Sequence, residues 1–184
     1  PGVAAGRVHV PTAGGLWLAA IGEGIVLTAG TGSLCMGRRT GGDGDIRAGG
    51  YGYRMPSETG GYFLGIHAID VALQVADGRR QDDSVLREVV MNHLGIASPV
   101  EITPLLYPEG GTAAVQEKVA ALAPRVLDVA GGGDQASAGL VYQVVDCMAG
   151  HPSLIHIFEP TKLRRLLYFV SCLQKNRTLN PPSG

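Results

Sequence analysis

Residues 24–65 decide the fold of this chain and read GIVLTAGTGSLCMGRRTGGDGDIRAGGYGYRMPSETGGYFLG. The apolar run at 25–27 is too short for a helix and rich in β-branched residues, so it predicts a buried strand. It breaks at 29–33 (AGTGS), where glycines let the backbone approach a ligand and leave N–H groups for an anion. The run at 34–37 predicts a returning strand. The pattern is therefore a hairpin with a phosphate-type turn.

A polar turn over residues 38–45 leads to a second glycine cluster, GGYGY at 49–53. We expect this cluster to form a backbone loop that faces the same site as the hairpin turn. Neither cluster matches GxxxxGK(S/T) or GxGxxG ahead of a helix, so the common nucleotide fingerprints are absent. Asp43 and Asp45 flank a glycine between two strands, which is more typical of a solvated turn than of metal ligands.

These motifs together resemble the actin-like ATPase superfamily of sugar kinases, heat-shock ATPases and actin. The matching segments are GIVLTAGTGS at 24–33, RAGGYGY at 47–53, and Glu58, Gly61 and Tyr62 ahead of the next helix. Within the superfamily, the chain is most similar to the N-acetylglucosamine kinases and the BadF/BadG/BcrA/BcrD-type ATPases, from about residue 24 to about residue 147. The resemblance implies an α/β fold, a fragment of an actin-like (ribonuclease H-like) ATPase with a β-hairpin sheet followed by a helical region.

The resemblance also implies roles for two sets of residues. In that family GTGS is a phosphate-binding hairpin, which implies ATP contacts for Gly30, Thr31, Gly32 and Ser33. The glycine loop and the segment after it line the sugar pocket, which implies substrate contacts for Gly49, Gly50, Tyr51, Gly52, Ser57 and Glu58. The implied cofactors are ATP and Mg²⁺, and the implied substrate is an amino sugar such as N-acetylglucosamine or glucosamine. A homodimer is compatible with the resemblance.

Two segments depart from the family pattern. The family places a general-base Asp before the hairpin, but the matching position here falls near residues 12–13 or near Val3, and none of these is acidic. We therefore assign no catalytic residue. Where the family has Gly-Asp-Glu-Gly, this chain has PSET at 56–59, so Ser57 lacks the charge-assisted bonding of a carboxylate. Glu58 fits equally a sugar ligand or a cap for the next helix.

Apolar periodicity predicts a series of helices after the loop. Gly, Pro and Asp residues mark the expected ends of these helices. We expect helices at 60–76, at 85–94, at 98–107 with an interruption at Pro104, at 112–130 with a kink or split at Pro124, and at 135–148 with Asp134 as the cap. In the first of these, Phe63, Ile66, Ile69 and Leu73 share one face. Ahead of the hairpin, residues 7–10 favour a strand and residues 16–21 a short helix. A plain helical bundle beside the sheet fits this periodicity as well as the family's helical region does.

Composition bounds the class of protein. The chain has 184 residues, 45% of them hydrophobic, and a formal net charge of −1, so nothing indicates nucleic-acid or membrane-surface partners. Its three cysteines, Cys35, Cys147 and Cys172, form no CxxC pair, which favours a reducing, cytoplasmic location. No apolar run has membrane length and no signal peptide is recognised. Pro1 at the first position favours a start inside a longer protein.

We divide the chain into a partial sugar kinase domain at 1–150 and a tail at 151–184 without family pattern. Residues 153–161 and 167–176 look like translated sequencing adapter, so we interpret the tail as an artefact of the reading frame. A natural basic C-terminal helix that includes Lys162 and residues 166–170 stays open as the alternative.

The functional hypothesis is ATP-dependent phosphorylation of an amino sugar by the intact parent, with no kinase activity in this fragment. One alternative is a BadF-type ATPase that activates a partner enzyme holding an iron–sulfur cluster. Another is a non-catalytic, degenerate nucleotide- or sugar-binding module. Cys35 falls on a predicted strand rather than at a ligand position, which favours the kinase over the activator.

Overall fold

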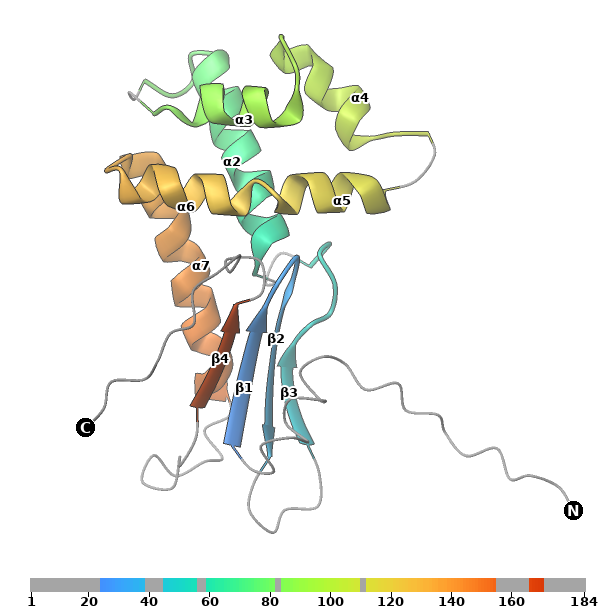
Figure 1. Cartoon of the computed structure of the whole chain (residues 1–184), viewed down its shortest axis with the longest axis vertical. Coiled ribbons are helices and arrows are strands. Elements are labelled where there is room, and N and C mark those ends of the chain that lie inside the picture. The colour runs from blue at the N-terminus through green and yellow to red at the C-terminus, as the bar shows by residue number, and fades with distance from the viewer. Residues whose placement is uncertain are drawn as a thin grey trace, which may run out of the picture.

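The computed structural model describes residues 24–38, 45–55, 59–81, 84–109, 112–154 and 166–170. The strand and helix expected before residue 24, positions 3 and 12–13, Asp43, Ser57 and Glu58 lie outside the described residues. The described elements form a four-stranded sheet with a cluster of helices beyond the β1–β2 turn, and α7 runs back along the sheet (Figure 1). Within these ranges, no helix combines the length and apolar composition that crossing a bilayer needs.

The sheet is built on the predicted hairpin. β1 (Gly24–Ala29) pairs antiparallel with β2 (Ser33–Arg38), and β2 pairs antiparallel with β3 (Asp45–Gly49), so the first three strands form a meander. Ile25, Leu27, Cys35 and Ala48 form a small core on one face of the sheet, and Met148 of α7 packs against it. This contact attaches α7 to the sheet.

A fourth strand comes from the C-terminal tail. β4 (Leu166–Val170) lies parallel to β1, from Ile25 opposite Leu166 to Ala29 opposite Val170, and gives the strand order β3-β2-β1-β4. The alternative of a C-terminal helix is therefore wrong for residues 166–170. The run LLYFV is apolar and aromatic, and such residues fit a pleated position beside a buried strand. The origin of the tail stays a prediction.

Five predicted helical segments are confirmed with adjusted bounds. The structure has α2 (Gly61–Ala76), α3 (Leu86–Leu94), η1 (Pro99–Glu101) with α4 (Ile102–Leu106), α5 (Ala113–Ala120), α6 (Ala123–Gly131) and α7 (Gln135–Leu154). Pro124 splits the fourth segment, as expected, because proline is tolerated in the first turn of α6. Pro104 does not interrupt α4, since it also lies in a first turn, where the N–H has no helical partner.

The predicted buried face of α2 is only partly correct. Ile69 is buried, but Phe63, Ile66 and Leu73 are half-buried. The buried positions include small residues, and the full set is Gly61, Leu64, Gly65, Ala68, Ile69, Val71 and Ala72. α2 packs against α3, α5, α6 and α7, so neighbours on several sides replace the single face that periodicity predicts.

Gly65 marks the closest approach between α2 and α5. A Cβ placed on Gly65 would lie 2.0 Å from the carbonyl oxygen of Val119, a distance that real side chains do not adopt. Val119 of α5, Leu122 between the two helices and Val126 of α6 are buried and belong to the main core together with residues of α2. The missing side chain at Gly65 therefore permits the central helix contact of the helical region.

Asp134 caps α7 and also binds the segment before α3. Its Oδ1 accepts hydrogen bonds from the backbone N–H and the hydroxyl of Ser137, both at 2.7 Å, while Oδ2 accepts one from the N–H of Val85 at 3.0 Å. The hydroxyl of Ser84 donates a further bond at 3.3 Å. Burial alone would raise the pKa of Asp134, but these hydrogen bonds together lower it.

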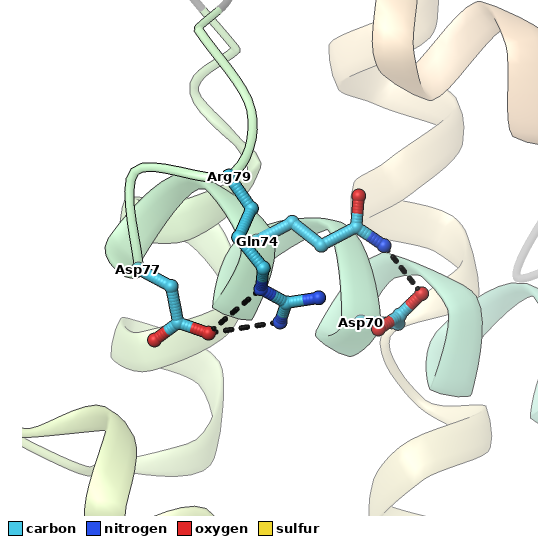
Figure 2. A network of polar contacts seen from close by, with 4 residues as sticks. All are labelled: Asp70, Gln74, Asp77 and Arg79. Atoms are coloured by element: carbon cyan, nitrogen blue, oxygen red, sulfur yellow. Dashed lines mark hydrogen bonds and ion pairs between the residues drawn. The ribbon is translucent and has the colours of Figure 1, made fainter.

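Polar contacts at the end of α2 are a weaker feature (Figure 2). The amide of Gln74 donates to Asp70 at 2.8 Å, and Arg79 donates to Asp77 at 2.8 and 3.1 Å. The side chains of Arg79 and Asp77 are 58% and 52% exposed, and exposed ion pairs of this kind add about 0–1 kcal/mol. Packing at Gly65 and capping at Asp134 therefore matter more for this region.

We expect Gly65→Ala to lower the free energy of unfolding by about 1–3 kcal/mol, because the new methyl group would force α2 away from α5. The matched control is Gly139→Ala in α7, where nothing lies within 4 Å of the added Cβ. The control should be neutral or stabilising by up to about 1 kcal/mol. Urea unfolding of both variants measures the difference, and equal stabilities would contradict the proposed close contact.

Asp134→Ala should lower the free energy of unfolding at pH 7 by about 1–2 kcal/mol, since it removes the cap of α7. The pKa of Asp134 is lower in the folded state, so its stabilisation is present above the unfolded pKa and is lost as pH falls through the folded one. The gap between wild type and variant should therefore narrow between about pH 5 and pH 2. Thermal melts of wild type and Asp134→Ala across this range test it, and a gap that stays constant from pH 7 to pH 2 would contradict it.

Candidate functional site

The turn between β1 and β2 presents its tip to solvent. Thr31 and Gly32 are exposed, and the N–H of Gly30 donates to the carbonyl oxygen of Gly32 at 2.7 Å, which closes the turn. A Cβ added at Gly32 would meet nothing within 4 Å. The surface beside Gly32 is therefore open, and a ligand can reach the backbone there.

The N-terminus of α2 holds this turn in place. The N–H groups of Gly61 and Tyr62 donate to the carbonyl oxygens of Gly30 and Thr31 at 2.7 and 2.9 Å. Two amides that would have no partner at a helix start are thus satisfied by the turn. Gly60, with φ of 123°, makes the fit possible, because a Cβ there would lie 2.7 Å from the carbonyl carbon of Gly32.

Ser33 anchors the turn to Thr59, just ahead of α2. Its hydroxyl lies 2.6 Å from the hydroxyl of Thr59 and accepts the N–H of Thr59 at 3.2 Å. Both residues are buried, with 4% and 1% of their surfaces exposed. The hydroxyl that the motif offers to a phosphate is therefore used in this structure to hold residue 59 against the hairpin.

The second glycine loop lies at the same edge of the sheet. Leu34, next to the turn, pairs with Gly49 at the end of β3, so the loop that follows Gly49 leaves the sheet beside the turn. Tyr51 is 69% exposed. The structure thus brings Gly30 to Gly32 and Gly49 to Gly52 together, as expected, whereas Ser57 and Glu58 lie outside the described residues.

Tyr62 joins the two loops. Its N–H binds Thr31, and its ring packs edge-to-face on the ring of Tyr53 with 5.0 Å between ring centres. The hydroxyl of Tyr53 lies 3.3 Å from that of Thr112 and accepts a bond from Arg54 at 3.1 Å. The sequence analysis did not predict this cluster of Tyr53, Tyr62 and Thr112. Its one local sign in the sequence is Tyr53, the second tyrosine of GYGY.

Hydrogen bonds and burial shift the two tyrosines in opposite directions. The hydrogen bond with Thr112, followed by the one from Arg54, lowers the pKa of Tyr53. Burial, more than neighbouring tyrosines, raises the pKa of Tyr62. Tyr62 is therefore suited to packing, while Tyr53 is a polar contact between the loop and the start of α5.

Asp45 and Cys35, which lie near the hairpin, make structural contacts. Asp45 is the first residue of β3 rather than part of a turn, and it binds Arg38 at 2.6 Å. Cys35 is fully buried, and burial raises its pKa to about 11. The described residues contain no group of three or more His, Cys, Asp or Glu side chains that could hold a metal ion.

Comparison with known proteins gives related kinases. No family model matches the chain. Over 90 residues it is 36% identical to the N-acetylmuramic acid/N-acetylglucosamine kinase of Clostridium acetobutylicum, a match that covers 49% of this chain and 29% of that protein. The chain spans less than a third of this curated relative.

Two solved structures share the fold. A protein of Chromobacterium violaceum described as an N-acetylglucosamine kinase matches with a TM-score of 0.62 and 27% identity, over 76% of this chain and 46% of that one. A similarly described protein of Porphyromonas gingivalis matches with a TM-score of 0.55 and 21% identity, over 73% and 44%, and shows the fold alone. The resemblance inferred from the sequence is confirmed: the chain is similar to part of an N-acetylglucosamine kinase and has an α/β fold corresponding to part of an actin-like ATPase.

Proposed function

We propose that the intact protein transfers the γ-phosphoryl group of ATP to a hydroxyl group of an amino sugar. The observation that carries this proposal is the position of the exposed Thr31–Gly32 tip beside the exposed Tyr51 loop. The kinase named for the Clostridium relative supports the reaction class. N-acetylglucosamine, glucosamine and N-acetylmuramic acid are the candidate substrates.

The hairpin tip fits a phosphate group. It offers the hydroxyl of Thr31 and a backbone at Gly32 with no side chain in the way, while Ser33 holds the turn in shape. Gly30, Thr31, Gly32 and Ser33 thus remain the proposed ATP contacts, with Ser33 acting through position. We propose that Mg²⁺ binds together with the nucleotide phosphates, as is usual where a phosphoryl group is transferred. When bound, Mg²⁺ neutralises charge on the transferring group.

The glycine loop fits one wall of a sugar site. The exposed ring of Tyr51 combines an apolar face with a polar hydroxyl, which suits the mixed surface of a sugar. Gly49, Gly50 and Gly52 are proposed to line the same wall; Gly52 is exposed, while the carbonyl oxygens of Gly49 and Gly50 accept hydrogen bonds from Arg47. Ser57 and Glu58 are proposed to complete this wall. Transfer would then depend on orientation of the two substrates and on charge stabilisation.

The fragment by itself is expected to lack kinase activity. No acidic residue stands at positions 3, 12 or 13, where the resemblance places the general base. The division into a partial kinase domain at 1–150 and a tail at 151–184 is likewise a proposal. We also propose a cytoplasmic location, which the odd number and the spacing of the cysteines favour.

The buried thiol of Cys35 supports the kinase over the BadF-type activator. An iron–sulfur ligand has to reach the cluster, whereas the side chain of Cys35 is fully buried in the small core of the sheet with Ile25 and Leu27. A non-catalytic binding module remains the other alternative. It requires only the binding surfaces at the hairpin and the loop.

The phosphate role is tested with Gly32→Ala. The added methyl group enters open space, so the fold should be retained while close approach of a phosphate is blocked. We expect binding of MgATP to the 184-residue chain, followed by calorimetry, to weaken about tenfold or more. Gly139→Ala is the control. Equal affinity for MgATP in Gly32→Ala and wild type would contradict a phosphate contact at the turn. Absence of MgATP binding by wild type would also contradict it.

The sugar kinase activity is tested on the source gene. The locus should be sequenced outward from the codons of residues 24–65, and the recovered reading frame expressed and assayed for ATP-dependent phosphorylation of the three candidate sugars. We expect one of them to be phosphorylated and the codons of residues 151–184 to be absent. A locus that ends as in this chain, with binding but no turnover, would favour the non-catalytic module.

A further inference from the structure

Arg47 contacts three of the residues that follow it on the chain. Its Nε donates to the carbonyl oxygen of Gly49 at 3.0 Å, and its Nη2 donates to the carbonyl oxygen of Gly50. The centre of its guanidinium group lies 5.5 Å from the centre of the Tyr51 ring, within cation–π range. One exposed side chain on β3 thus spans the whole entry into the second glycine loop.

A side-chain contact at the start of the loop matters because the first two residues of the loop are glycines. Gly49 and Gly50 have φ of 75° and 76°, two consecutive left-handed residues, and glycine pays a large entropy cost when it is fixed. Strand pairing reaches Gly49, opposite Leu34, and stops there. Beyond this last strand pair, Arg47 contacts the next two residues, Gly50 through a hydrogen bond and Tyr51 through its ring.

We propose that Arg47 is a positioning residue of the glycine loop: its forked guanidinium fixes the Gly49 and Gly50 carbonyls and supports the Tyr51 ring in its exposed position. The planar fork of arginine can bond two acceptors and stack on a ring at the same time, which the single ammonium group of lysine cannot do. The ligand of the loop, an amino sugar, rests on the proposed function. The effect of Arg47 on loop order does not.

The first experiment measures loop order in the 184-residue chain. Hydrogen exchange of peptides covering residues 48–55 is compared for wild type, Arg47→Ala and Arg47→Lys. The control is Arg38→Ala, which removes a half-buried arginine from the far end of the same strand pair, where it binds Asp45. We expect about tenfold faster exchange in Arg47→Ala, a smaller increase in Arg47→Lys and none in the control. Thermal melts report whether each variant is folded.

Two exchange results would overturn the inference. Exchange at the wild-type rate in a folded Arg47→Ala variant would show that the loop is ordered without Arg47. Full recovery in Arg47→Lys would show that positive charge alone acts and that the fork is not needed. A merely structural role for Arg47 in the sheet would instead change the melting temperature without a local change at residues 48–55.

The second experiment separates this inference from the proposed function. N-acetylglucosamine is titrated into the same four proteins and followed by NMR. We expect binding about tenfold weaker in Arg47→Ala, with Arg38→Ala equal to wild type. If wild type binds and Arg47→Ala binds equally well, the inference is overturned. If wild type does not bind, the sugar role of the loop is overturned, and the exchange data still decide whether Arg47 orders it.

Discussion

The structure depends on the backbone hydrogen bonds between the start of α2 and the turn of the β1–β2 hairpin. The N–H groups of Gly61 and Tyr62, which have no partner within the helix, donate hydrogen bonds to the carbonyl oxygens of Gly30 and Thr31. This contact between α2 and the turn leaves no room for a side chain at Gly60, because a Cβ there would overlap the backbone of Gly32. The sheet and the helical region are therefore joined backbone to backbone. This contact sets where the exposed tip of the turn lies.

Patterns of neighbouring residues predicted the elements well, while contacts between distant segments escaped them. The hairpin, the helix boundaries and the Asp134 cap follow from turn chemistry and periodicity over a few residues. The buried face of α2 was only partly predicted. Periodicity identifies one apolar face, whereas α2 packs against neighbouring helices on several sides. The contacts of Ser33 with Thr59 and of Tyr53 with Thr112 join residues 26 and 59 positions apart, which no local pattern encodes.

The candidate site separates the groups that shape it from those that can meet a ligand. Ser33 and Thr59 bond to each other in the interior, and Tyr62 packs between the two loops. Thr31 and Tyr51 remain exposed at the same edge. A motif such as GTGS therefore predicts a location more reliably than it predicts the role of each residue, because a buried hydroxyl stabilises the turn whether or not a phosphate is bound.

The glycines of this chain show why composition alone does not identify a binding loop. Gly65 is required by a neighbouring helix, Gly60 by the backbone of the turn, and Gly50 by a left-handed conformation that Arg47 stabilises. Gly32 differs from all three, since its Cβ position is empty and its conformation suits other residues. No packing within the described residues requires a glycine there. Gly139 on α7 shares this open space, so the open space at Gly32 supports a ligand contact only together with the place of Gly32 at the exposed tip of the phosphate-type turn.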